Sequence, residues 1–175
     1  MDEIQLVEYD SRWPELFLSE AKRVKSALPV GLAVSIEHFG STSIPGLIAK
    51  PIIDMLVAVR SVPEAREIAV LPLASIGYAF WSDNPRRDRL FFVKGLPPAA
   101  AHRTNHIHIL EPGSDMQAQL LFRDYLRSHP DEALRYGELK LELMARHRSD
   151  REAYTAAKST YVDQVIVKAR AEKAL

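Results

Sequence analysis

Apolar and polar positions along this chain follow two different periods, and the dominant period changes near residue 114. In the first part, short apolar runs bounded by glycine, proline or aspartate predict strands. These runs cover residues 34–39, 52–59, 77–81, 90–93 and 106–110. Apolar residues at three- and four-residue spacing predict helices instead. We expect helices over residues 14–28, 63–73, 114–129, 131–147 and 150–174.

The order of these elements indicates an α+β fold. Strands fill the first two thirds of the chain and helices the last third, which is typical of a mixed sheet backed by helices. No internal repeat, low-complexity segment or linker divides the sequence. We therefore interpret residues 1–175 as one domain, whose helical C-terminal part runs from about residue 114 to residue 175.

Composition narrows the class of partner. The net charge is zero, so no overall field attracts nucleic acid or an anionic membrane. The absence of cysteine excludes disulfides and thiolate metal sites and is consistent with a reducing cytoplasm. The first residues lack the basic and apolar regions of a signal peptide, and no apolar run approaches the ~20 residues of a membrane span. We expect a cytoplasmic protein with a small-molecule partner; the sequence does not fix its oligomeric state.

Residues 37–54 hold the strongest chemical signal. A predicted strand ends at Gly40, Ser41 and Thr42, and the next strand carries Asp54 among apolar neighbours. Glycine permits a close approach of the backbone, and the hydroxyls and amides that follow suit a phosphate. A carboxylate on an apolar strand is costly unless it binds something. We interpret this segment as a phosphate loop beside a metal-binding carboxylate; the alternatives are a tight turn and a strand-end Asp that accepts backbone hydrogen bonds.

Two histidines form a second candidate group. His106 and His108 are two residues apart on a predicted strand, so both face the same side. They could form half of a metal site or an acid/base pair, and an equally plain alternative is two hydrogen-bonded structural histidines.

Basic residues could neutralise an anionic ligand. Lys50 precedes the strand of the candidate carboxylate, and Arg89 precedes a strand that could pair with the histidine strand. Arg123 lies on a predicted helix, where it either joins a salt-bridged face or extends a phosphate-binding surface. Lys140 and Lys158 allow the same two interpretations, and for them we favour a solvated helix face.

Several blocks of the sequence resemble a known family. Residues 37–47 followed by 50–54 resemble the GrpB family (UPF0157), and a Gly-Ser loop followed by an Asp on the next strand resembles the nucleotidyltransferase (DNA polymerase beta-like) superfamily. Further matching blocks span nearly the whole chain in the expected order: residues 13–14, 89–92, 106–108, 122–127 and 154–158.

The resemblance implies a nucleotidyltransferase that moves a nucleotidyl or phosphoryl group from a nucleoside triphosphate to an unidentified acceptor. We expect a divalent metal, Mg²⁺ or Mn²⁺, held by Asp54 and His108, with His106 or His108 as third ligand or general base. The candidate catalytic residues are then Asp54, His106 and His108. The candidate substrate-binding residues are Gly40, Ser41, Thr42, Lys50, Arg89 and Arg123.

One position departs from the superfamily pattern. Catalytic members carry a second carboxylate two residues after the first, and here that position is Leu56. Two-metal magnesium chemistry normally needs more than one carboxylate, whereas Asp54 with His108 suits Mn²⁺ or Zn²⁺, or no fixed metal. The alternative function is a non-catalytic nucleotide- or phosphometabolite-binding module. A third hypothesis is that the loop is only structural and the protein acts through a partner.

Overall fold

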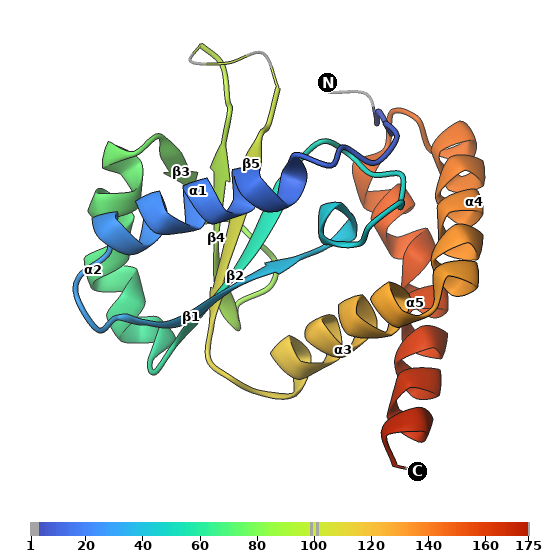
Figure 1. Ribbon diagram of the computed structural model, residues 1–175. Coiled ribbons are helices and arrows are strands. Elements are labelled where there is room, and N and C mark those ends of the chain that lie inside the picture. Colours follow the sequence, from blue (N-terminus) through green and yellow to red (C-terminus); the bar gives the residue numbers. More distant parts are fainter. Residues whose placement is uncertain (1–3, 99, 101, 175) are drawn as a thin grey trace.

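The computed structural model describes residues 4–98, 100 and 102–174 (Figure 1). Within this part of the chain the strands form one five-stranded sheet in the order β1-β2-β5-β4-β3. Strands β2 and β5 are parallel, and the other neighbours are antiparallel. This mixed sheet confirms the α+β class. The strands are β1 (Ala33–Phe39), β2 (Ile53–Val59), β3 (Tyr78–Phe80), β4 (Arg89–Lys94) and β5 (Asn105–Leu110).

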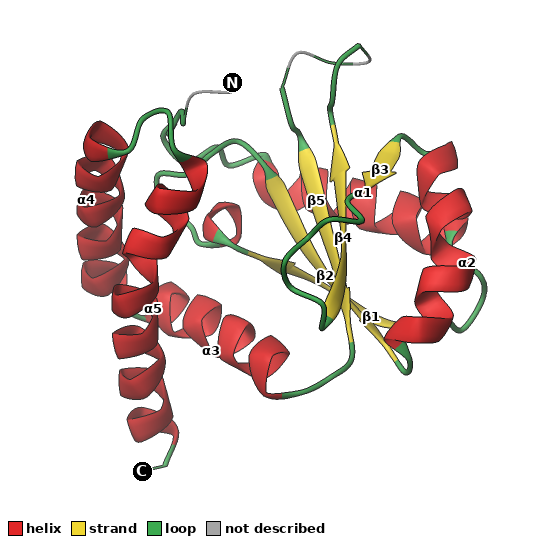
Figure 2. Cartoon of the chain, turned by 180° about the vertical axis from the view of Figure 1, so that it is seen from behind, coloured by secondary structure: helices red, strands yellow, loops and turns green. Residues whose placement is uncertain are grey.

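Helices cover the two faces of the sheet unequally (Figure 2). One face carries two helices, α1 (Trp13–Ala27) and α2 (Val62–Ser75), and the other is covered by the first of three C-terminal helices. These are α3 (Ser114–Ser128), α4 (Pro130–Arg146) and α5 (Arg151–Lys173). No helix in the described ranges combines the length and apolar character that a membrane crossing requires.

Strand β2 is the centre of the core, as its apolar run predicts. Met55 and Val57 face α1 and α2, while Leu56 and Ala58 face α3, and all four side chains are buried. The alternation places Asp54 on the same face as Leu56, at the end of the strand that α3 does not cover. An uncovered region therefore remains between this end of the sheet and the helices α4 and α5.

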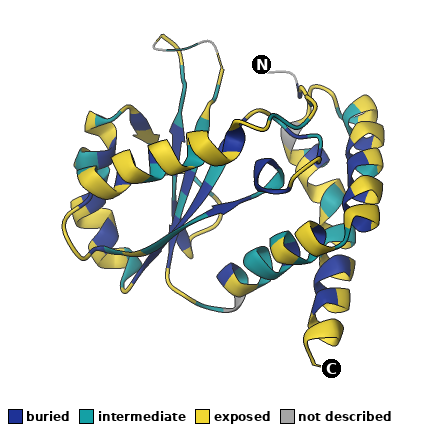
Figure 3. Cartoon of the chain, viewed as in Figure 1, coloured by how far each residue is buried: buried dark blue, intermediate teal, exposed yellow. Residues whose placement is uncertain are grey.

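The loop after β1 is held by the C-terminal helices. It begins with a short 3₁₀ turn, Ser41–Ser43, and then buries Ile44 and Leu47 in a cluster with residues from α3, α4 and α5. Figure 3 shows that the short turn after β1 is buried, whereas the outer faces of the helices are largely exposed. Packing of the loop fixes the turn at the edge of the uncovered region, where the candidate residues lie.

Candidate functional site

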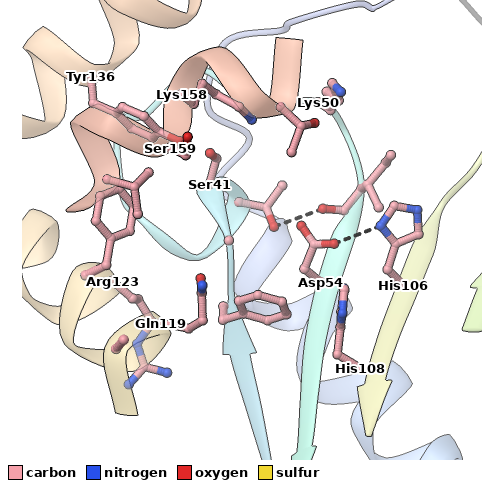
Figure 4. Close-up of a pocket in the computed structure, with 18 of the residues that line it drawn as sticks. Ser41, Lys50, Asp54, His106, His108, Gln119, Arg123, Tyr136, Lys158 and Ser159 are labelled. Carbon is pink, nitrogen blue, oxygen red and sulfur yellow. Dashed lines mark hydrogen bonds and ion pairs between the residues drawn. The ribbon is translucent and has the colours of Figure 1, made fainter. Parts of the chain in front are cut away.

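A pocket of about 680 Å³ lies between the sheet and the C-terminal helices (Figure 4). The candidates chosen from the sequence come from four strands or loops and one helix. All of them line this pocket: Gly40, Ser41, Thr42, Lys50, Asp54, Arg89, His106, His108 and Arg123. The structure therefore brings the candidates together, and their individual contacts separate those that face a ligand from those already engaged.

Asp54 and the two histidines form one cluster because β2 pairs with β5. The parallel register places Asp54 opposite His106 and Leu56 opposite His108. His106 Nδ1 lies 3.0 Å from Asp54 Oδ1. One ligand-capable atom from each of the three residues lies within 4.8 Å of the others. The three side chains thus form a compact group of metal-ligand type.

Two nitrogen atoms of this cluster are buried without a partner. Neither His106 Nε2 nor His108 Nδ1 has a hydrogen-bond partner among the described residues. Buried polar atoms are rarely left in this state in folded proteins, so each one calls for an explanation. Because an ionised Asp54 can only accept a hydrogen bond, we place the proton of His106 on Nδ1, which leaves a lone pair on Nε2. A metal ion or a ligand donor would satisfy that lone pair.

The electrostatics of the cluster favour its metal-binding forms. Burial acts to raise the pKa of the Asp54 carboxyl, but the His106 hydrogen bond and electrostatic interactions with the surrounding histidines outweigh it and lower that pKa. Burial lowers the pKa of His108 to about 3. At neutral pH the cluster therefore contains a carboxylate and a neutral imidazole, the forms in which these side chains bind metals.

Gly40 brings the backbone against Asp54. Its φ is +71°, and a Cβ atom at this position would lie 2.6 Å from Asp54 Oδ2. The glycine is thus needed both for its conformation and for space. The close backbone approach that the sequence suggested for a ligand is made here to the carboxylate.

The hydroxyl of Thr42 is already used, which corrects part of its predicted role. It donates to the carbonyl of Ile52 at 3.1 Å and lies 3.1 Å from His38 Nε2, in a buried position. These bonds fix the turn to β2 and to the base of β1. Thr42 can offer a ligand only its backbone, whereas Ser41 keeps a half-buried hydroxyl in the pocket.

Lys140 and Lys158 were interpreted as solvated, and this was wrong. Lys140 is 2% exposed and donates hydrogen bonds to Ser41 Oγ at 3.0 Å and to the carbonyl of Ile48. Burial lowers the pKa of Lys140 to about 7 and that of Lys158 to about 8. Lys158 lies over the ring of Tyr154. Both lysines line the pocket.

A sequence signal for Lys140 did exist. It lies on the apolar stripe of α4, in three- and four-residue register with buried residues before and after it. These neighbours are Ala133, Tyr136, Gly137 and Leu143. A lysine within such a stripe faces the interior, where its charge must be compensated or lost.

Arg89 is largely compensated within the protein. Its side chain is buried, and it donates to Asp88 at 2.9 Å and also to Asp115. Two carboxylates already share this guanidinium, so its charge is less available to a phosphate than the sequence suggested. Arg89 borders the pocket as part of this ion-pair network.

Arg123 combines the two roles considered for it. Its Nη1 donates to Glu37 Oε2 at 3.0 Å and to the carbonyl of His38 at 2.9 Å, while the side chain still lines the pocket.

Lys50 lies over the ring of Tyr154, with Nζ 4.6 Å from the ring centroid. The pocket therefore combines the cluster of Asp54 and the histidines with several lysines, and the Asp54 carboxylate acts against burial to favour the charged form of Lys158.

Comparison with known proteins gives a consistent family. The family model described as "GrpB protein" matches residues 3–168. A UPF0157 protein of Pseudomonas aeruginosa is 44% identical over 97% of this chain and 69% of its own length. The UPF0157 protein YqkA of Bacillus subtilis is 37% identical over 91% of this chain, which spans only 45% of that relative. The crystal structure of conserved protein GrpB from Enterococcus faecalis aligns with a TM-score of 0.85 and 32% identity, covering 98% of this chain and 100% of that one.

Proposed function

Because this chain belongs to the GrpB family, we propose that its pocket binds a nucleotide or another phosphorylated small molecule beside a divalent metal. The reaction is transfer of a nucleotidyl or phosphoryl group to an acceptor, in the manner of the nucleotidyltransferase superfamily. The observation that carries this proposal is the cluster of Asp54, His106 and His108. It offers one carboxylate and two imidazoles whose ligand-capable atoms lie within 4.8 Å of one another, and all three residues line a pocket large enough for a nucleotide.

The donor set fits a borderline metal better than magnesium. Magnesium prefers a shell of oxygen ligands, whereas imidazole suits Mn²⁺ and Zn²⁺. Asp54, His106 and His108 are the residues that would hold the ion. When bound, the ion would supply positive charge to a phosphoryl oxygen.

The lysines of the pocket support a phosphorylated ligand. Among the described residues Lys158 forms no close ion pair with a carboxylate, and burial disfavours its charge more than the nearby Asp54 favours it. A phosphate placed beside it would restore the charged form through charge-assisted hydrogen bonds. Backbone amides of the turn at Ser41 and Thr42 would add uncharged donors to the same group.

A second function, binding without turnover, is favoured by Leu56. This residue occupies the position of the second carboxylate, and its side chain is 0% exposed against α3. The protein therefore cannot place a second acid there, and the usual two-metal arrangement is not available. A binding module would use the same pocket and the same turn for recognition alone.

Calorimetry with ATP, GTP, CTP and UTP, with and without Mn²⁺ or Zn²⁺, tests the proposal. If the protein is an enzyme, binding should depend on the metal, and pyrophosphate or phosphate should be released. Asp54→Asn should abolish turnover and leave the circular dichroism spectrum unchanged. Asp163→Asn is the matched control, because this exposed carboxylate of α5 lines the same pocket and does not belong to the cluster of Asp54, His106 and His108. Metal-independent binding without turnover supports the module, and absence of all phosphate-ligand binding contradicts both functions.

A further inference from the structure

Ser41 and Lys140 meet on the wall of the pocket, although they are 99 residues apart in sequence. The Nζ atom of Lys140 lies 3.0 Å from Ser41 Oγ and also bonds to the carbonyl of Ile48, which fixes its direction. Among the described residues no carboxylate pairs with Lys140, although it is 2% exposed. A serine beside a buried lysine with no acidic partner is the arrangement of a nucleophile with its base.

We propose that Ser41 is a nucleophile, that Lys140 is its general base, and that the group taken from the substrate is carried transiently on Ser41. The inference rests on the proposed function for its substrate, a phosphoryl ester of nucleotide type. It adds a covalent intermediate that the cluster of Asp54 and the histidines does not by itself require.

The local backbone presents Ser41 to the pocket. Gly40, with its positive φ, ends the strand and starts the 3₁₀ turn, so Ser41 stands at a sharp strand-to-helix corner (Figure 4). This is the kind of corner at which other nucleophilic serines are exposed. The next two hydroxyls are engaged elsewhere, Thr42 with the carbonyl of Ile52 and Ser43 with that of Gly40. Ser41 has the lysine as its partner.

The surroundings of Lys140 favour the unprotonated amine. Burial is the main cause, and the positive charge of Lys158 on α5 acts in the same direction. Among the described residues none of the carboxylates that line the pocket, Asp54, Asp115 and Asp163, pairs with Lys140. Other titratable groups of the pocket are Tyr136 on α4, Tyr154 on α5 and Lys50 before β2. None of them supplies a negative charge at neutral pH, because burial raises the pKa of both tyrosines. An amine that is partly unprotonated at pH 7 can accept the proton of a serine.

The two steps balance without a redox change. First, Ser41 Oγ attacks the α-phosphorus as Lys140 Nζ takes its proton; the Oγ–P bond forms, the bond from phosphorus to the bridging oxygen breaks, and pyrophosphate leaves with the electron pair. Second, the acceptor hydroxyl attacks the same phosphorus and gives its proton to solvent. The P–Oγ bond breaks, and Ser41 takes back the proton that Lys140 held.

Labelling with diisopropyl fluorophosphate tests the pair without nucleotide or metal. In this reaction the Oγ–P bond forms, the P–F bond breaks, fluoride leaves and the proton passes to Lys140. We expect one adduct by intact mass, located on Ser41 by peptide mapping and absent in Ser41→Ala. From a lysine pKa of about 7, labelling should be about tenfold faster at pH 8 than at pH 6.

Substitutions of Lys140 distinguish a general base from a side chain that only holds the structure. Lys140→Met and Lys140→Arg should each slow labelling by about 100-fold or more, because neither side chain accepts the proton. Lys25→Met, on an exposed face of α1, should leave the rate unchanged. Each variant is checked for its thermal midpoint, and the wild-type pH profile gives a result even if the Lys140 variants do not fold.

Two outcomes overturn the inference: wild-type protein without an adduct on Ser41, or folded Lys140→Arg that labels at the wild-type rate. If labelling fails while nucleotide turnover depends on metal, the covalent route is wrong and the proposed function stands. If labelling succeeds but no nucleotide or phosphorylated ligand binds, the serine and lysine pair stands and the proposed function is wrong.

Discussion

The backbone of Gly40 lies against the carboxylate of Asp54, so that a single added methyl group would stand 2.6 Å from Asp54 Oδ2. This contact joins the two parts of the segment that the sequence singled out, the turn after β1 and the acid of β2. It also makes the position of the acid dependent on the conformation of the turn. Substitution at the glycine should therefore change stability and metal binding together.

Gly40→Ala should destabilise the protein more than Gly46→Ala. Both glycines have positive φ, so alanine at either costs about 1–2 kcal/mol in backbone strain. At Gly46 an added Cβ meets nothing within 4 Å, whereas at Gly40 it adds overpacking of about 1–3 kcal/mol. Urea unfolding measures the difference, and equal losses in the two variants would contradict the contact.

Asp115→Asn should destabilise the protein by about 1–3 kcal/mol, because it removes a charged partner of the buried Arg89. The control is Asp83→Asn, which changes an exposed carboxylate in the turn before β4. It should change the free energy of unfolding by less than about 0.5 kcal/mol. The midpoint of urea unfolding at pH 7 compares the two variants. If Asp115→Asn were as stable as the wild type, Arg89 would not depend on this pair.

Lys140 should make stability rise with pH above neutrality. Its pKa is about 7 in the folded protein and near 10.5 in the unfolded chain, so between these values the unfolded chain binds the extra proton. Unfolding then takes up a proton, and the free energy of unfolding increases by up to about 1.4 kcal/mol per pH unit in this window. Below pH 7 both states are protonated and this contribution is smallest.

Lys140→Met should flatten this part of the profile, most clearly between pH 7 and 8. Lys158, with a pKa of about 8, contributes mainly above that range. Urea unfolding at half-unit pH steps from 6 to 9 checks the result, with Lys25→Met as control. An unchanged slope in Lys140→Met would show that this lysine is charged in the folded state.

Much of the fold followed from periodicity. The strand and helix ranges predicted from apolar spacing agree with the structure to within about two residues, because each element buries one or both faces in the same core. The order of the strands in the sheet could not be predicted from periodicity. The parallel pairing of β2 with β5 depends on contacts between residues far apart in sequence, such as Asp54 and His106, which are separated by 52 residues.

The site residues on strands could be predicted, because side-chain direction follows from the two-residue period of a strand. The contacts of the lysines and arginines were harder to predict. The two-residue alternation placed Asp54, His106 and His108 correctly on their strand faces. Each of the two arginines has one acidic partner that is distant in sequence, Asp115 for Arg89 and Glu37 for Arg123, so these pairings could not be predicted. The burial of Lys140 was not predicted, because a single lysine on a helix is usually a surface residue. Its position in the apolar stripe of α4 indicates the interior instead.

His108→Ala should weaken binding of Mn²⁺ or Zn²⁺ by at least about tenfold, because it removes one of the few ligand atoms of the proposed site. His102→Ala, at an exposed histidine, should leave the affinity unchanged. Isothermal titration with the metal alone measures both affinities. Equal affinities in His108→Ala and the wild type would place the metal elsewhere.

The most direct test of the proposed site is a crystal soaked with Mn²⁺ and a non-hydrolysable ATP analogue, with anomalous diffraction recorded for manganese. The account predicts an anomalous peak within coordination distance of Asp54 and His108, and phosphate density between that peak and Lys158. A nucleotide bound outside this pocket, or a manganese peak that does not contact Asp54, would contradict it.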